Sequence, residues 1–394
     1  MLRREVGVRK IKVVFLVSEL SKWKGQSVWD KMKSNNLFEP SIAVIPYGCE
    51  MDLPTHEVSR ILQEKMAYFY NLGMNVRCRW DIKRKEAIPF NSDDVDILFY
   101  QQPWEIPAQL QPSRVSRFAL TYYFPYYVQN NLDYDLEVRQ WFHRTLYRYI
   151  VFSNQVKKLY EKNIGGWRWS RTVEFMPFGH PMLDNYTIGK VSRQEKNYVI
   201  YAPHFSIKYG DFSPILTYST FIETGKYILE FAKSHPEINW VFKPHPGLRT
   251  TLVRAKFMSE SEVEGYYREW ESIGTACYTA DYVKLFLSSR AIITDCGSFL
   301  TEYAATGRPI IRLLRNDAFY EPHPSLKKLY ATYYEARSKA ELGRLLKLVV
   351  LNGKDPLREI RQLEARNAGL IKEDSAVEIV RSIGLLLRNG NKYG

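Results

Sequence analysis

The sequence predicts an α/β protein with two doubly wound parallel sheets, and three observations support this class. Short apolar runs of strand length alternate with stretches of helical length along most of the chain. The chain has 394 residues, too many for one ordinary hydrophobic core, so two domains are expected. A hydrophobic content of 45% with a charged content of 25% is typical of a globular protein.

Six short apolar runs in the first half predict the strands of a first sheet. All but the segment 75–80 are rich in Val, Ile, Leu, Phe or Tyr, and most are followed by polar or turn residues. One helix is expected from about Ser27, after a polar loop, and another over 55–71, ending near Gly73. The strands are expected at 12–17, 42–46, 75–80, 96–100, 118–123 and 149–153.

A second series of the same kind follows a turn-rich segment and a polar stretch. Its strands are expected at 198–203, 239–242, 276–278, 291–294 and 309–314. Its helices are expected at 218–234, 281–289 and 298–306, with terminal helices at 338–351 and 355–388.

The two series divide the chain into two predicted Rossmann-like domains. We expect an N-terminal acceptor domain over 1–190, a C-terminal nucleotide-donor domain over 191–350, and helices over 351–394 that return toward the first domain. Two facing doubly wound parallel-sheet domains with C-terminal helices packing across both form the GT-B architecture. The step to that fold is an analogy.

The net charge of +13 favours anionic partners. The basic residues are dispersed, without a long Lys/Arg run, a zinc finger or an RNA-binding signature, so nucleic acid is not expected as a partner. Phosphorylated substrates fit this charge better. Four N-terminal basic residues, Arg3, Arg4, Arg9 and Lys10, leave a peripheral contact with an anionic membrane open, with a solvated N-terminus as the alternative.

Cysteine usage and the N-terminal segment favour a cytoplasmic location. The four cysteines form no CxxC pair and no disulfide framework, which suits a reducing compartment. The first apolar run has strand length, too short for a signal peptide core or a membrane span. We expect a cytoplasmic protein, with a peripheral position at the inner face of the cell membrane left open. The sequence predicts no oligomeric state.

The first informative motif is the turn from Thr294 to Tyr303, which joins a strand to a helix. The strand delivers Asp295 to the sheet edge, Gly297 permits close backbone approach, and Ser298 offers a hydroxyl and an amide at the helix start. A helix N-terminus favours a bound phosphate, and Glu302, one turn on, can accept hydrogen bonds from ribose hydroxyls. The competing interpretation is an ordinary strand–turn–helix unit capped by its serine.

The second motif is the stiff turn Lys243-Pro244-His245-Pro246, at the end of another strand. Lys243 can neutralise a phosphate, and His245 can donate a hydrogen bond to phosphate or act as a general acid. His204 follows the first strand of the second domain and is a further candidate phosphate contact, with a structural loop histidine as the alternative. Together the two motifs predict a pocket for a nucleotide diphosphate.

The first domain offers fewer chemical groups. Its acceptor site is expected at strand ends, within 18–23, 101–104 and 122–127. Glu19 directly follows the first strand and is the candidate catalytic base, with a solvated loop glutamate as the alternative.

No metal and no cofactor are expected. Asp94-Val95-Asp96 has the DxD spacing of metal-dependent sugar transferases, but it precedes a predicted strand and therefore lies at the wrong edge of the sheet. We interpret it as a strand-entry cap, and no other cluster of His, Cys and carboxylate residues has ligand spacing.

With these motifs in place, residues 178–315 resemble the CDP-glycerol:poly(glycerophosphate) glycerophosphotransferase family of teichoic acid and capsule assembly. The matching elements are a linker, a strand exit, a Pro-flanked turn, a strand–helix turn and a Pro-Ile-Ile strand. They are Gly179-His180-Pro181-Met182-Leu183-Asp184, Tyr201-Ala202-Pro203, Lys243-Pro244-His245-Pro246, Thr294-Asp295-Cys296-Gly297-Ser298 and Thr306-Gly307-Arg308-Pro309-Ile310-Ile311. The linker lacks the Arg often found after its Pro.

The resemblance implies a GT-B fold, a CDP-linked alditol donor and metal-independent transfer of a polyol phosphate. The acceptor would be a glycan, a lipid-linked intermediate or teichoic acid. It also implies that His245 stabilises the donor pyrophosphate, with Ser298 on phosphate and Glu302 near the ribose.

The chain departs from this family in the first domain. Family members of the teichoic type have a Trp-His-Gly motif whose His is the proposed base, whereas residues 121–127 contain neither His nor Gly. Another residue could be the base, the donor phosphate could take the proton, or the acceptor and the reaction could differ.

Three other functions stay open at this point. One is a GT-B glycosyltransferase using a UDP-, GDP- or CMP-linked sugar for capsule, O-antigen or cell-wall glycan. Another is a non-enzymatic module that binds glycan or scaffolds an assembly complex. The last is a UDP-sugar epimerase built on the same two-domain plan.

Overall fold

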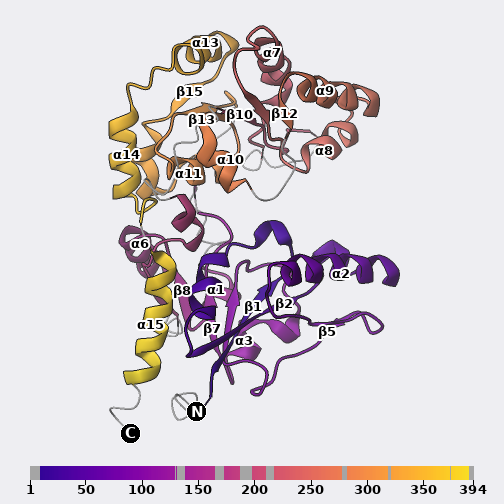
Figure 1. The fold of residues 1–394 in the computed structure, drawn as a ribbon, viewed down its shortest axis with the longest axis vertical. Coiled ribbons are helices and arrows are strands. Elements are labelled where there is room, and N and C mark those ends of the chain that lie inside the picture. The colour runs from indigo at the N-terminus through magenta and orange to yellow at the C-terminus, as the bar shows by residue number, and fades with distance from the viewer. Residues whose placement is uncertain are drawn as a thin grey trace. The chain divides into compact units, whose positions relative to one another are not determined.

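The computed structural model describes residues 9–128, 130, 138–164, 173–186, 198–209, 217–276, 282–317, 321–372 and 374–389. The chain forms two compact units (Figure 1). Unit 1 comprises Met1–Val128, Asp133–Asp184 and Lys372–Gly394, and unit 2 comprises Gln129–Leu132 and Asn185–Ile371.

Unit 1 is built on a seven-stranded sheet in which every adjacent pair is parallel. The interior strand β1 is buried along nearly its whole length, as is typical of strands in parallel sheets. In sheet order the strands are β3 (Val76–Cys78), β2 (Phe38–Val44), β1 (Ile11–Val17), β6 (Ile97–Tyr100), β7 (Leu120–Tyr123), β8 (Arg148–Ile150) and β9 (Glu174–Met176). A separate hairpin pairs β4 (Trp80–Asp81) with β5 (Glu86–Ala87).

The helices of unit 1 bury one face each. In α2 (Thr55–Asn71) the buried side chains Val58, Leu62, Lys65 and Phe69 recur at helical spacing. The remaining helices are α1 (Gln26–Lys33), α3 (Pro112–Val115), α5 (Trp141–Arg144), α6 (Asn154–Ile164) and α15 (Ser375–Asn389), with short 3-10 turns at Leu20–Lys22, Gly48–Glu50, Ala108–Leu110 and Pro181–Tyr186.

The last helix of the chain belongs to unit 1 and packs against α1 (Figure 1). Asp184 caps its start, because the carboxylate accepts hydrogen bonds from the backbone N–H groups of Ser375 and Ala376, each at 2.9 Å. Asp184 is the last residue of the linker motif, so this motif anchors the C-terminal helix.

Unit 2 has a six-stranded parallel sheet. Its order is β12 (Thr275–Ala276), β11 (Trp240–Phe242), β10 (Tyr198–Ala202), β13 (Ser289–Thr294), β14 (Ile310–Leu313) and β15 (Tyr334–Ala336). Its helices are α7 (Phe221–Lys233), α8 (Leu248–Arg254), α9 (Glu260–Ile273), α10 (Val283–Ser288), α11 (Gly297–Ala304), α12 (Lys327–Tyr330), α13 (Lys339–Leu345), the π-helical segment Leu346–Leu351 and α14 (Arg358–Asn367), plus a 3-10 turn at Pro324–Leu326.

Both sheets are parallel and doubly wound, so the predicted α/β class is confirmed. The prediction of one helix over 355–388 is wrong: α14 contacts α11 and α12 in unit 2, whereas α15 lies in unit 1. The chain breaks between them where Gly369 and Asp374 adopt φ values of 80° and 65°, which no α-helix accommodates. The sequence analysis also missed several elements, namely β5, β9, β15, α3, α5, α6, α8, α9 and α12.

No helix within the described residues is both long enough and apolar enough to span a lipid bilayer.

Candidate functional site

The carboxyl edge of the unit 2 sheet brings the predicted motifs together. Strand β10 lies between β11 and β13 and pairs in parallel with both. The turn after β11 stays attached to β10, because Lys243 N–H donates to the Tyr201 carbonyl at 2.8 Å and His245 N–H donates to the Pro203 carbonyl at 3.0 Å. Residues that follow these three strands therefore share one edge, where ligands of parallel sheets bind.

Asp295 holds this edge in place from the end of β13. Its carboxylate accepts hydrogen bonds from the backbone N–H groups of His204 and Thr220, each at 2.6 Å, and from the Thr220 hydroxyl at 2.9 Å. Asp295 is 5% exposed, and burial raises its pKa to about 6 although the hydrogen bonds oppose that shift. The carboxylate thus fixes the loop after β10 and the start of α7.

The turn into α11 is fixed by Thr294. Its buried hydroxyl donates to the Ala202 carbonyl at 2.6 Å and accepts from the Cys296 N–H at 2.9 Å. The helix begins at Gly297, and Cys296 at the N-cap position provides no side-chain cap. Ser298 is therefore in a first turn where amide groups and the helix dipole favour an anion.

Gly297 has a local reason to lack a side chain. A Cβ atom at this position would collide with the side-chain amide of Asn130, which lies directly against the glycine. The backbone at the start of α11 is consequently approached closely from one side.

His245 is held in a defined tautomer. Gly247 N–H donates to its Nδ1 at 3.0 Å, so in the neutral ring the proton resides on Nε2. Burial, together with the nearby Lys243 charge, lowers the pKa of His245 to about 4. At neutral pH this histidine is therefore an uncharged donor through Nε2–H.

His204 has the same arrangement. Its Nδ1 lies 2.7 Å from the Ser206 hydroxyl and 3.3 Å from the Ser206 backbone nitrogen, which donates to it. Burial, and secondarily His245, lower the pKa of His204 to about 3. The two imidazole rings lie edge to face with their centroids 5.0 Å apart. The pair presents polar N–H groups without a permanent charge.

Lys243 and Glu302 both contact the side chain of Tyr282, next to α11. The Lys243 ammonium lies 5.0 Å from the ring centroid of Tyr282 and 6.0 Å from that of Phe299. The Tyr282 hydroxyl donates to Glu302 Oε2 at 2.8 Å. Lys243 and Glu302 are almost fully buried, and burial raises the pKa of Tyr282 well above its usual value.

The structure therefore gathers seven of the eight predicted site residues at one sheet edge. They are Lys243, His245, His204, Asp295, Gly297, Ser298 and Glu302. An ammonium, two imidazole N–H groups and a helix N-terminus can hold phosphate oxygens, and a carboxylate can accept from hydroxyl groups.

The eighth residue, Glu19, lies in unit 1 directly after β1. It forms an ion pair with Lys22 and is partly exposed. His180 of the linker motif is also in unit 1, where its Nε2 lies 2.7 Å from the Pro125 carbonyl; this histidine is buried inside unit 1.

Sequence reasoning missed the residues that support this edge. Thr220 and Ser206 belong to no recognisable sequence motif. Their contacts with Asp295 and His204 are visible only in the folded chain. A hollow of about 320 Å³ also lies at the carboxyl ends of β14 and β15, where Thr220 and Arg315 are among the lining residues. Arg315 follows β14 almost directly, and a cation in that position is the sequence feature that could have pointed to this hollow.

Among the described residues, no group of three or more His, Cys, Asp and Glu side chains is placed to bind a metal ion. The two aspartates of the DxD segment make structural contacts within unit 1. Asp96 accepts from the Lys12 N–H at 2.8 Å and pairs with Arg9, while Asp94 pairs with Arg79 at 3.1 Å.

No protein-family model and no curated protein matches this sequence. Solved structures do resemble the chain. A UDP-GlcNAc 2-epimerase from Neisseria meningitidis bound to UDP-GlcNAc is 12% identical, with a TM-score of 0.55 over 95% of this chain and 99% of that one. S. aureus MnaA with UDP is 12% identical, with a TM-score of 0.54 over 96% and 97%.

A variant of the wall teichoic acid polymerase TagF is 10% identical, with a TM-score of 0.56 over 98% of this chain and 90% of that one. These identities are too low to assign a function, but the coverage is nearly complete. They confirm the predicted GT-B fold.

Proposed function

We propose that this protein is a GT-B transferase that moves a polyol phosphate, glycerol or ribitol phosphate, from a CDP-linked donor to a glycan or teichoic-acid-like acceptor. The observation that carries this proposal is the convergence of Lys243, His245 and His204 with the start of α11 at one sheet edge. Such an edge suits a pyrophosphate, because it offers the positive charge of Lys243 and several fixed donors.

Each part of the donor has a partner in this proposal. Lys243 neutralises a pyrophosphate oxygen, Ser298 and the first-turn amides of α11 hold another, and Glu302 accepts from the ribose hydroxyls. His204 donates through Nε2–H to the same diphosphate. Asp295 is a positioning residue, since its carboxylate is already engaged by His204 and Thr220.

The reaction is a substitution at phosphorus. The acceptor hydroxyl oxygen forms a bond to the phosphorus that bears the polyol, the bond to the bridging oxygen breaks, and CMP leaves with the electron pair. His245 stabilises the charge that develops on CMP through Nε2–H. The acceptor proton goes to Glu19 or to the transferred phosphate. The substrates would place the enzyme in the cytoplasm, peripherally at the inner face of the cell membrane.

The structural neighbours support the nucleotide part of the proposal. One TagF structure was soaked with CDPG, and the epimerase from Neisseria meningitidis was solved with UDP-GlcNAc. The CDP-linked donor rests on the motif resemblance. The second candidate is a GT-B enzyme acting on a UDP-sugar, because UDP-GlcNAc 2-epimerases are among the neighbours.

A thermal-shift panel separates the two. CDP-glycerol, CDP-ribitol, CMP, UDP-GlcNAc and GDP-mannose are each added to the full chain. A ligand at a hundredfold excess over its Kd stabilises the folded state by about 2.7 kcal/mol, so only true ligands raise Tm clearly. We expect shifts with CDP-alditols and CMP, followed by CMP release in a turnover assay. Stabilisation by UDP-sugars alone would reject the CDP-linked donor.

A further inference from the structure

A second polar site lies in unit 1, at the carboxyl ends of β1 and β6. A small cavity of about 10 Å³ is lined there by Ser18, Glu19, Lys22, Gln101 and Gln102, among others. This volume is at the lower limit for one water-sized group. The sheet edge is also the one at which parallel α/β domains bind ligands.

Two polar atoms of this cavity have unused hydrogen-bonding capacity. Ser18 Oγ and Gln102 Oε1 are buried and make no hydrogen bond to any residue that the structure describes. Each residue is 5% exposed. An unsatisfied buried polar atom destabilises a fold by about 1–3 kcal/mol, so two beside one cavity indicate a ligand or an ordered water.

The neighbouring hydrogen bonds fix the Gln102 amide and the Ser18 backbone. Gln102 Nε2 donates to the Trp104 carbonyl at 3.0 Å, which defines the amide orientation. The Ser18 carbonyl accepts from the buried Lys65 ammonium at 2.5 Å. Beside them, the Gln101 side chain is engaged, since it accepts from the Lys24 N–H at 2.6 Å. The unused atoms thus belong to a rigid frame.

Aromatic rings stand beside the cavity around Lys22. The Lys22 ammonium lies 3.8 Å from the ring centroid of Tyr47, 5.3 Å from that of Tyr126 and 6.0 Å from that of Trp104. Burial lowers the pKa of Lys22, and its ion pair with Glu19 opposes that shift. Partly exposed rings around a small polar cavity are typical of sites for polyols and sugars.

We propose that this cavity binds a hydroxyl group of a polyol or sugar acceptor, with Ser18 donating to it and Gln102 Oε1 accepting from it. The inference rests on the proposed function and names the acceptor class. A hydroxyl fits because it both donates and accepts. A phosphate conflicts with the Gln102 oxygen and the Glu19 carboxylate, and a cation conflicts with Lys22.

Glu19 lines this cavity and is the candidate base for a hydroxyl bound there. Lys22 is a positioning residue, since its ammonium forms an ion pair with that carboxylate.

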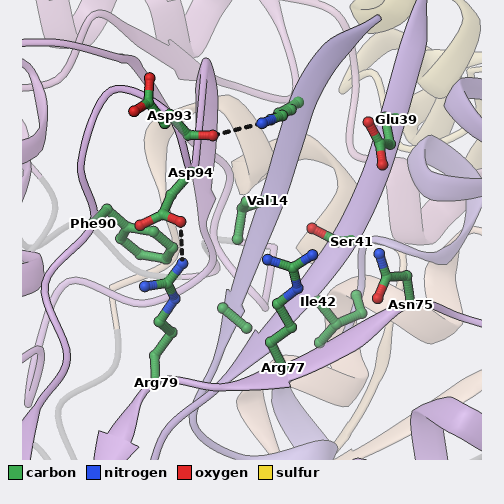
Figure 2. Close-up of a pocket in the computed structure, with 12 residues that line it drawn as sticks. Val14, Glu39, Ser41, Ile42, Asn75, Arg77, Arg79, Phe90, Asp93 and Asp94 are labelled. Carbon is green, nitrogen blue, oxygen red and sulfur yellow. Dashed lines mark hydrogen bonds and ion pairs between the residues drawn. The ribbon is translucent and has the colours of Figure 1, made fainter.

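Another hollow of unit 1 does not meet these criteria. Figure 2 shows it against β1, β2 and β3. Two of its basic groups are already engaged, since Arg79 pairs with Asp94 at 3.1 Å and the Lys12 ammonium donates to the backbone carbonyl of Asp93 at 2.6 Å. The exposed Arg77 in this hollow supplies a control position.

The test compares Gln102→Leu, Ser18→Ala and the control Arg77→Gln in the full chain. Three readouts are taken: the saturation-transfer NMR signal of glycerol, ribitol and methyl β-N-acetylglucosaminide, the KM of whichever probe accepts the polyol phosphate, and urea unfolding. Gln102→Leu should weaken the NMR signal of the bound probe and raise its KM at least tenfold. It should leave the CDP-glycerol thermal shift unchanged and lower stability only modestly, because the Trp104 carbonyl loses its donor. Arg77→Gln should change none of these.

Three outcomes would overturn the proposal. One is an unchanged probe signal and KM in both cavity variants. The second is destabilisation of Ser18→Ala with unchanged binding, which would assign the cavity to a structural water. The third is an equal effect of Arg77→Gln. Failure of the proposed function is distinguishable, because wild-type protein would then show no CDP-glycerol shift while the probe signal still reports on the cavity.

Discussion

The carboxyl edges of the two sheets differ in how their polar groups are satisfied. In unit 2, Asp295 accepts three hydrogen bonds, and the Nδ1 atoms of both edge histidines accept from neighbouring N–H groups. In unit 1, Ser18 Oγ and Gln102 Oε1 have no partner among the described residues. An edge that holds a diphosphate needs donors fixed in advance, whereas an edge that receives a neutral hydroxyl can keep both a donor and an acceptor unused.

The largest expected effect comes from breaking the unit 2 edge at Asp295. Asp295→Ala removes three hydrogen bonds and leaves two buried N–H groups without their acceptor, so we expect a loss of about 3–5 kcal/mol in the free energy of unfolding. The nucleotide-induced thermal shift should vanish as well. Urea unfolding measures the first effect, and the exposed Asp317→Ala is the matched control. Equal curves for the two variants would contradict the role given to Asp295.

The next effect concerns the reaction. His245→Ala should reduce CMP release more than tenfold, equivalent to about 1.4 kcal/mol or more of transition-state stabilisation. His245→Gln should retain part of the activity, because its amide can still donate a hydrogen bond. The control His56→Ala alters an exposed histidine on α2. Normal turnover in His245→Ala would remove this residue from the reaction.

A third prediction uses a buried histidine of unit 1. His143 lies among aromatic rings, its two ring nitrogens have no partner among the described residues, and burial lowers its pKa to about 3. The unfolded chain binds a proton near pH 6.5, so stability is complete above that value and falls as the pH drops toward 3.

Replacement of His143 by Phe should therefore weaken the acid sensitivity of unit 1. Each pH unit below 6.5 lowers the free energy of unfolding by up to about 1.4 kcal/mol through this group. Urea unfolding at pH 7 and pH 5 should show a smaller difference between the two pH values for His143→Phe than for wild type. Identical pH dependence would mean that the histidine is charged in the folded state.

The smallest effect tests the aromatic side of the unit 1 cavity. Tyr47→Phe keeps the ring under the Lys22 ammonium, whereas Tyr47→Leu removes it, so the pair isolates a cation–π contact of about 0.5–1 kcal/mol. The leucine variant should also weaken the NMR signal of bound sugar more than the phenylalanine variant does. If both variants behave alike, the ring face has no part in binding.

The sequence predicted the parts of the fold that depend on local pattern. Buried strands such as β1 and β13 are continuous apolar runs, and α2 has a long helical period, so their positions follow from the residues alone. Strands β9 and β15 have three residues each and include an exposed glutamate, which leaves too little pattern to recognise. The break between α14 and α15 had a local signal in Gly369 and Asp374, whereas the unit against which each helix packs had none.

The candidate site likewise has parts that the local sequence predicts and parts that only the fold reveals. The Lys243 and Thr294 turns could be found because each directly ends a strand, and parallel pairing then places them at one edge. The hydrogen bond between Asp295 and Thr220 joins residues 75 positions apart, and neither local sequence predicts it. The unused oxygen of Gln102 is likewise a property of packing, since a buried glutamine in a sequence does not reveal its partners.

Calorimetric titration of CDP into wild-type protein and into Lys243→Ala tests the central claim most directly. We predict one binding site per chain in the wild type and at least tenfold weaker binding in the variant, because the Lys243 ammonium is the one full positive charge assigned to the diphosphate. Equal affinity in both proteins, or no binding in the wild type, would contradict the assignment of the unit 2 edge as a nucleotide-diphosphate site.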